Sequence, residues 1–242
     1  MVHYRKLPKG TQLFRYNLGV NLPKDWSSDY KSIEYQDSVL GPKNQVGALF
    51  FYDNETTACQ VLSSALSKRQ TPPIENTITS CFLLEDVVLL DLSQCEFPTC
   101  VLRILRDEGI DILTNDYVRH DQGCSLFSEL KDDFLFMLEN DNVEFFPGNG
   151  ALKVYNAANR INDFFHYSKV GIRYIGQLLT DFENGNLFKT ALLEKGFDGY
   201  CFTEEPSPTI CIFDASKITP PTHNRIPRLT GLSGRDIKSE LV

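Results

Sequence analysis

Basic side chains gather near both ends of this chain. The first cluster lies within residues 3–15 and the second within residues 223–238. Their members are His3, Arg5, Lys6, Lys9 and Arg15 at the start, and His223, Arg225, Arg228, Arg235 and Lys238 near the end. Grouped cations can bind a phosphate-bearing ligand, although terminal charges are more commonly solvated. The pattern therefore leaves two interpretations, an anion site or a charged surface.

A second group combines cysteine and histidine between residues 95 and 124. Cys95, Cys100, His120 and Cys124 are all zinc-ligand types. Cys100 falls on an expected helix and no glycine-rich knuckle follows Cys95, which disfavours zinc. Cys124 is also a candidate nucleophile, but a histidine four residues away need not face the thiol. We therefore predict neither a metal site nor cysteine chemistry here.

The composition is that of a globular protein with a sizeable core. The chain has 242 residues, of which 42 % are hydrophobic and 23 % charged. Its net charge of −8 argues against nonspecific binding to nucleic acid or to anionic membranes. The first six residues are polar, and Glu85 and Asp86 interrupt the longest apolar stretch, residues 81–92. We therefore expect no secretory signal and no membrane span.

The cysteines indicate a reducing environment. Seven is an odd number, and Cys81, Cys201 and Cys211 fall within expected strands, where a reduced thiol packs as a small core residue. The sequence thus predicts a cytoplasmic protein without a disulfide framework.

Apolar patterning predicts strands, then a helical middle, then strands. The expected strands are 11–16, 46–52, one or two within 78–92, 197–202 and 210–213; the expected helices are 55–69, 98–106, 124–139, 158–182 and 187–195. Residues 17–45 read as a long loop. This order predicts a single α+β domain over residues 1–218, with a polar, partly ordered tail over 219–242.

Three segments resemble the ADP-ribosyltransferase family. They are Leu7-Pro-Lys-Gly-Thr-Gln-Leu-Phe-Arg15, Gly47-Ala-Leu-Phe-Phe-Tyr-Asp-Asn-Glu-Thr-Thr-Ala58, and Gly196-Phe-Asp-Gly-Tyr200 followed by Ile210-Cys-Ile-Phe-Asp-Ala-Ser-Lys-Ile218. Together they cover about fifty residues, and the helical middle matches no motif of the family. The resemblance implies a split sheet that binds NAD as a substrate in a cleft.

The same resemblance implies a role for each of six residues. Arg15 would orient the dinucleotide, Phe50 or Tyr52 would cover the nicotinamide, and Asn54 would lie at the cofactor. A carboxylate must stabilise the positive charge that develops on the ribose. Relatives place a glutamate just before the last apolar strand, where this chain has Thr209. Glu204 or Glu205, in the preceding loop, would then supply the anion.

Two functions follow from this reading. In the first, the chain is an NAD-binding mono-ADP-ribosyltransferase or NAD glycohydrolase, a viral or microbial effector that acts inside a cell on a protein acceptor. In the second, the fold is a catalytically inactive module that serves protein–protein interaction or a structural role. The Thr209 departure favours the second, so whether the chain is an enzyme stays open.

Overall fold

The chain divides into two compact units in the computed structural model. Unit 1 comprises Met1–Gly41, Ala48–Ser93 and Gly196–Val242, and unit 2 comprises Pro42–Gly47 and Gln94–Lys195. The structure describes residues 3–18, 22, 24–26, 44, 46–67, 75–95, 98–110, 185–204 and 207–227. The predicted helices 124–139 and 158–182 lie outside these residues, as do most of the predicted loop 17–45 and the tail beyond residue 227.

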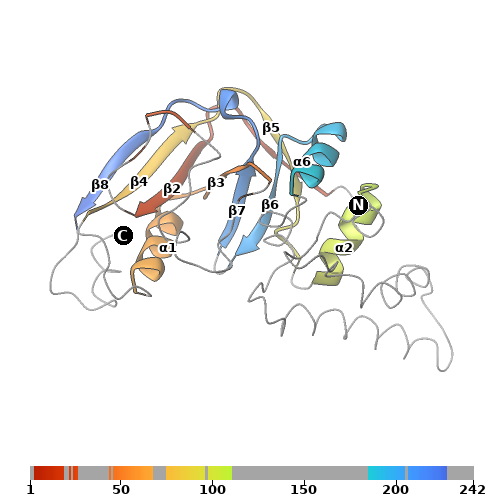
Figure 1. The fold of residues 1–242 in the computed structure, drawn as a ribbon, viewed down its shortest axis with the longest axis horizontal. Coiled ribbons are helices and arrows are strands. Elements are labelled where there is room, and N and C mark those ends of the chain that lie inside the picture. The colour runs from red at the N-terminus through yellow and green to blue at the C-terminus, as the bar shows by residue number, and fades with distance from the viewer. Residues whose placement is uncertain are drawn as a thin grey trace. The chain divides into compact units, whose positions relative to one another are not determined.

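The described residues of unit 1 form two β-sheets, the helix α1 and a short 3-10 helix (Ala215–Lys217), which confirms the α+β class (Figure 1). The strands are β1 (Tyr4–Leu7), β2 (Gln12–Leu18), β3 (Leu49–Phe51), β4 (Glu75–Phe82), β5 (Val87–Asp91), β6 (Gly199–Glu204), β7 (Ser207–Ile212) and β8 (Thr222–Pro227). One sheet has the order β1-β5-β6-β7-β3 and the other β2-β4-β8. Strands from the start of the chain therefore pair directly with strands from its end.

The two sheets join where β2 passes β3. The backbones of Phe14 and Tyr52 exchange two hydrogen bonds, with N···O distances of 2.9 and 2.7 Å. Beyond this bridge the strands belong to different sheets. Leu13 and Cys81 of the three-stranded sheet pack in one buried cluster with Phe51, Leu89 and residues of the five-stranded sheet. We call this cluster the shared core.

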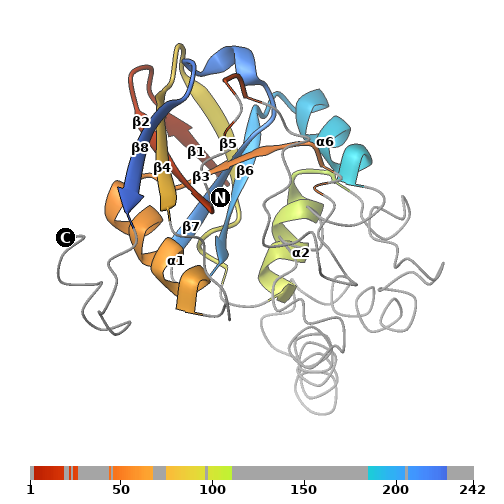
Figure 2. The same ribbon diagram turned by 60° about the vertical axis from the view of Figure 1, so that its left-hand side comes forward.

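Helix α1 (Glu55–Ser67) covers the other face of the three-stranded sheet (Figure 2). Asn54 begins the helix, because its side-chain oxygen accepts a 2.7 Å hydrogen bond from the Thr57 backbone N–H. Ala58 and Leu62 are buried against Leu18 and Ile78 of the sheet. The predicted helix start is thus confirmed.

The Gly196–Tyr200 segment has a structural explanation. Gly196 adopts φ +83°, in the left-handed region that suits glycine after a helix. A Cβ on Gly199 would collide with the carbonyl oxygen of Cys211 on the neighbouring strand. Asp198 accepts a 2.8 Å hydrogen bond from Val88 N–H and pairs with Lys217 at 2.8 Å. Packing and strand pairing therefore account for this motif.

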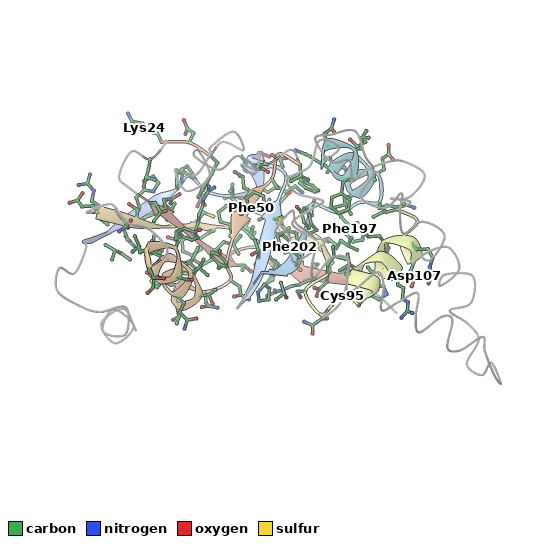
Figure 3. All side chains as sticks on the ribbon, turned by 60° about the horizontal axis from the view of Figure 1, so that its bottom comes forward. Lys24, Phe50, Cys95, Asp107, Phe197 and Phe202 are labelled. Carbon is green, nitrogen blue, oxygen red and sulfur yellow. A yellow bond between two sulfur atoms is a disulfide. The ribbon has the colours of Figure 1, made fainter. Side chains whose placement is uncertain are left out.

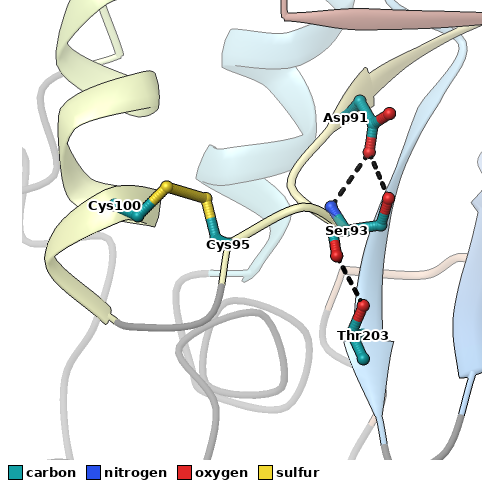
Figure 4. Close-up of a disulfide and its surroundings, with 5 residues drawn as sticks. All are labelled: Asp91, Ser93, Cys95, Cys100 and Thr203. Atoms are coloured by element: carbon teal, nitrogen blue, oxygen red, sulfur yellow. Dashed lines mark hydrogen bonds between the residues drawn. A yellow bond between two sulfur atoms is a disulfide. The ribbon is translucent and has the colours of Figure 1, made fainter.

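Unit 2 contributes the described helices α2 (Pro98–Asp107) and α6 (Gly185–Glu194). Both fall where the sequence predicts helices. A disulfide joins Cys95, just before α2, to Cys100 in its first turn (Figure 4). The sequence predicts no disulfide framework, but this one disulfide forms because the first turn of α2 brings close two cysteines that lie five positions apart. Cys59, Cys81, Cys201 and Cys211 are buried and form no disulfide.

Two strands were absent from the sequence prediction. β1 and β8 are short and polar, but backbone pairing with β5 and β4 makes them strands. β8 occupies residues that the sequence assigned to the polar tail. The segment 78–92, left open as one strand or two, forms β4 and β5. Within the described residues, no helix is long and apolar enough to cross a membrane.

Candidate functional site

One face of the three-stranded sheet carries a row of polar and cationic side chains. In the antiparallel register Arg15 lies opposite Thr79, and Thr79 lies opposite His223. In the next row along this face, Asn17 lies opposite Thr77, and Thr77 opposite Arg225. Residues directly opposite one another project from the same face of a sheet. We call this set the Arg15 face; its members are Arg15, Asn17, Thr77, Thr79, His223 and Arg225.

Hydrogen bonds tie the centre of the Arg15 face together. Asn17 Nδ2 donates to Thr79 Oγ1 at 2.8 Å, and the same hydroxyl lies 2.8 Å from His223 Nδ1. Thr79 is 1 % exposed and Asn17 6 % exposed, whereas His223 is exposed. The buried polar groups therefore hold the imidazole of His223 in place from below.

The charge of this face differs from that of the whole chain. Arg15 and Arg225 are cationic, and His223 adds a group that can donate a hydrogen bond or carry a proton. Glu75 Oε2 lies 3.9 Å from Arg225 Nη1, and both side chains are well exposed. An exposed pair at this distance is weak. The face therefore combines two guanidinium groups and an imidazole in a protein of net charge −8.

Phe50 and Tyr52, the predicted aromatic residues, come from the segment that is bonded to β2 next to Arg15. Their side chains project from other faces than that of Arg15. Tyr52 is 9 % exposed and packs in the cluster against α1, where its ring stacks with Tyr16 at 6.5 Å between centroids. Tyr16 follows Arg15 directly and therefore projects from the opposite face of β2. Phe50, labelled in Figure 3, is half-buried on β3 and lies opposite Cys211. The backbone thus brings Arg15 and Tyr52 onto neighbouring strands without placing both side chains on one face.

The remaining predicted site residues have the following places. Asn54 caps α1. Glu204 ends β6 opposite Ser207, but its side chain and all of Glu205 lie outside the described residues. Thr209, at the position where the resemblance expects glutamate, is 3 % exposed on β7.

A polar cluster that the sequence did not single out lies at the carboxyl end of β5. Asp91 Oδ1 accepts three hydrogen bonds: from Ser93 N–H at 2.9 Å, from Ser93 Oγ at 2.6 Å and from Cys201 Sγ at 3.2 Å. Thr203 Oγ1 donates to the Ser93 carbonyl at 2.7 Å (Figure 4). Asp91 and Cys201 come from the parallel pair β5 and β6. Only this pairing of distant segments reveals the cluster, since Asp91-Leu-Ser93 is unremarkable as sequence.

The charge state of the cluster follows from its surroundings. Burial alone would raise the pKa of Asp91, but the hydrogen bonds from Ser93 and Cys201 and the charge of Arg5 outweigh burial and lower it. Burial, together with the Asp91 charge, raises the pKa of Cys201 to about 12. At neutral pH the site therefore holds a carboxylate and a protonated thiol. The Arg5 guanidinium also forms a 3.1 Å ion pair with Asp53, the residue that follows Tyr52.

The described residues include no group of three or more His, Cys, Asp or Glu side chains placed to hold a metal ion. Of the four residues weighed as zinc ligands, Cys95 and Cys100 are joined to each other, and His120 and Cys124 lie outside the described residues.

Comparison with known proteins yields little. No family model matches the sequence, and no curated protein matches it. One solved structure that matches is the M. tuberculosis MbcT–MbcA toxin–antitoxin complex, with 9 % sequence identity, coverage of 98 % of this chain and 91 % of that chain, and a TM-score of 0.38. A TM-score this low carries no argument about fold or function.

Proposed function

We propose that this chain binds NAD or a related ADP-ribose nucleotide on the Arg15 face, and that it transfers ADP-ribose from NAD or hydrolyses it. The observation that carries the proposal is the β2-β4-β8 register, which sets Arg15, Thr79 and His223 in one row. Guanidinium and imidazole groups on one face suit a diphosphate, since charge-assisted hydrogen bonds to phosphate are the strong ones.

The split between the sheets supports the same proposal. The ADP-ribosyltransferase-like arrangement, to which three segments of the sequence are similar, binds its nucleotide where two sheets part. Here β2 and β3 are bonded at Phe14 and Tyr52 and then belong to separate sheets. Arg15 is the first residue of β2 past that bridge.

Titration with NAD tests the binding. We expect saturable binding that Arg15→Ala weakens at least about tenfold, equivalent to about 1.4 kcal/mol. His223→Ala should weaken binding by a similar factor. Asn224→Ala is the matched control, because Asn224 is the exposed neighbour of His223 on β8 and projects from the other face. Equal affinity in all three variants would remove the Arg15 face from the site.

The reaction is tested separately. Incubation with NAD labelled in the adenosine part, alone and with cell lysate, should give free ADP-ribose for a hydrolase or labelled protein for a transferase. Released nicotinamide should appear in both cases.

A second candidate is a non-catalytic module of the same fold. Thr209, at the position where the resemblance expects a glutamate, is 3 % exposed, and Tyr52, one of the two aromatic candidates for covering the nicotinamide, is 9 % exposed. Both are part of the packed interior. Folded protein that neither binds NAD nor releases nicotinamide would support this candidate.

A further inference from the structure

We propose that Asp91 is the catalytic carboxylate of this protein. It takes the role of the glutamate that the resemblance expects at the position of Thr209. This inference rests on the proposed function, because it assigns a residue to the reaction of the same nucleotide.

Asp91 projects from the face of the five-stranded sheet that carries the shared core. Asp91 ends β5 two residues after Leu89, and Arg15 lies two residues after Leu13 on β2. Leu89 and Leu13 both belong to the shared core. Since side chains two residues apart in a strand project from the same face, Asp91 and Arg15 lie on the faces by which the two sheets meet. A nucleotide held by Arg15 at the edge of this core is therefore on the correct side of the five-stranded sheet for Asp91.

The end of β5 is also a usual place for a reactive group. β5 and β6 are the parallel pair of the sheet, and Asp91 lies opposite Cys201 in their register. Ligands commonly bind beyond the carboxyl ends of parallel strands. Asp91 is half-buried there, so solvent or a ligand can approach it.

The hydrogen bonds leave one oxygen of Asp91 for a ligand. Oδ1 takes the bonds from Ser93 N–H, Ser93 Oγ and Cys201 Sγ, which fix the plane of the carboxylate. Oδ2 accepts no hydrogen bond from the described residues. A carboxylate that is held by one oxygen and open at the other is arranged to act on a bound substrate without moving, and such preorganisation is the main source of electrostatic catalysis.

Asp53 and Asp198, the other half-buried aspartates among the described residues of unit 1, use both carboxylate oxygens in contacts within the protein. Asp53 bonds Arg5 through Oδ2 and the Asn54 side chain through Oδ1. Asp198 bonds Val88 N–H through Oδ2 and Lys217 through Oδ1. Both oxygens of each are occupied, so Asp91 differs from them in having an open acceptor.

In the proposed reaction Asp91 Oδ2 has one role, which is electrostatic. The bond between ribose C1′ and the nicotinamide nitrogen breaks, and its electron pair leaves with nicotinamide. The ribose gains positive charge, which Asp91 Oδ2 stabilises. In hydrolysis, water attacks C1′ and releases its proton to solvent; in transfer, the acceptor nucleophile takes the place of water. Asp91 stays ionised throughout and forms no covalent bond.

The experiment compares full-length wild type with Asp91→Asn and Asp198→Asn. Asparagine keeps an oxygen that can accept the Ser93 and Cys201 bonds, so the change removes charge with little change of shape. Asp198→Asn is the control, because it removes an aspartate charge beside the same pair of strands, where the carboxylate bonds Val88 N–H and Lys217. Binding of NAD and release of nicotinamide are measured on each protein, with the melting temperature as a check of folding.

We expect Asp91→Asn to bind NAD within about threefold of wild type and to release nicotinamide about a hundredfold more slowly, the usual scale for one electrostatic group. Asp198→Asn should release nicotinamide at nearly the wild-type rate. A purely structural Asp91 would instead weaken binding and slow release by the same factor, in line with the loss of folded protein, which would overturn the inference. If wild type is active and Asp91→Asn is equally so, the inference fails and the proposed function stands. If wild type binds no NAD and releases no nicotinamide, both fall.

Discussion

Asp198 offers the sharpest test of how unit 1 is held together. Its Oδ2 accepts the Val88 backbone N–H, and its Oδ1 pairs with Lys217. The Asp198 and Lys217 side chains are 20 % and 23 % exposed, so water screens the pair only in part. Asp198 lies just before β6 and Val88 lies within β5, so this aspartate joins the two strands of the parallel pair at their starts.

The magnitude can be worked from these contacts. A hydrogen bond to a charged group contributes about 1.5–3 kcal/mol, and a partly exposed ion pair contributes up to about 1 kcal/mol. Asp198→Ala removes both and should lower the free energy of unfolding by about 2–4 kcal/mol. Asp198→Asn keeps an acceptor for Val88 N–H and should cost only about 1 kcal/mol. Lys217→Met also breaks the exposed 2.6 Å pair of Lys217 with Glu85, so it should cost slightly more than Asp198→Asn.

The chain carries its own probe for this measurement. Trp26 is the single tryptophan; its ring packs edge-on against Phe51 at 5.2 Å, and its Nε1 donates to the Thr219 carbonyl at 2.7 Å. Tryptophan fluorescence in urea therefore reports the unfolding of unit 1, and an unchanged slope shows that the midpoint measures stability. In the double variant Asp198→Asn with Lys217→Met the losses should not add, because both changes break one pair. The reasoning is refuted if Asp198→Ala unfolds within about 0.5 kcal/mol of wild type, or no more easily than Asp198→Asn.

Four further predictions follow from the contacts described. Asn54→Ala removes the cap of α1 and should cost about 1 kcal/mol in urea unfolding, whereas Asn54→Asp keeps the cap; equal losses would contradict the capping role. Gly199→Ala forces a Cβ against the neighbouring strand and should cost at least about 1–3 kcal/mol, seen as a lower melting temperature. Burial raises the pKa of the Cys81 and Cys201 thiols to about 12. Iodoacetamide at pH 8 should therefore alkylate neither thiol in the folded protein but both in urea, as measured by mass spectrometry. Rapid labelling of the folded protein would contradict the burial. The pKa of Asp91 is lower in the folded than in the unfolded chain, so ionised Asp91 stabilises the folded state above about pH 4. This contribution is lost as the pH falls through the folded pKa, so the stability advantage of wild type over Asp91→Asn should shrink on acidification. A difference in stability that stays constant with pH would contradict this prediction.

Local order was readable from the sequence wherever the signal came from neighbouring residues. The helices predicted over 55–69 and 187–195 are present as α1 and α6, because an apolar stripe, the Asn54 cap and Gly196 all act through contacts within a few positions. The apolar runs of β3 and β7 were likewise predicted as strands. Their pairing with each other needed the fold, since Leu49 meets Ile212 across most of the chain.

The candidate site was decided by tertiary pairing. β8 was read as part of a polar tail because Thr222–Pro227 has no apolar alternation; hydrogen bonding to β4 makes it a strand and brings His223 into the row of Arg15. Asp91 gave no signal for the same reason, since its partner Cys201 lies 110 positions away. Residue types and spacing along the chain report which segments can be helices or strands, because those depend on local backbone and burial patterns. Which side chains share a face depends on the register between distant strands, and the folded backbone alone sets that register.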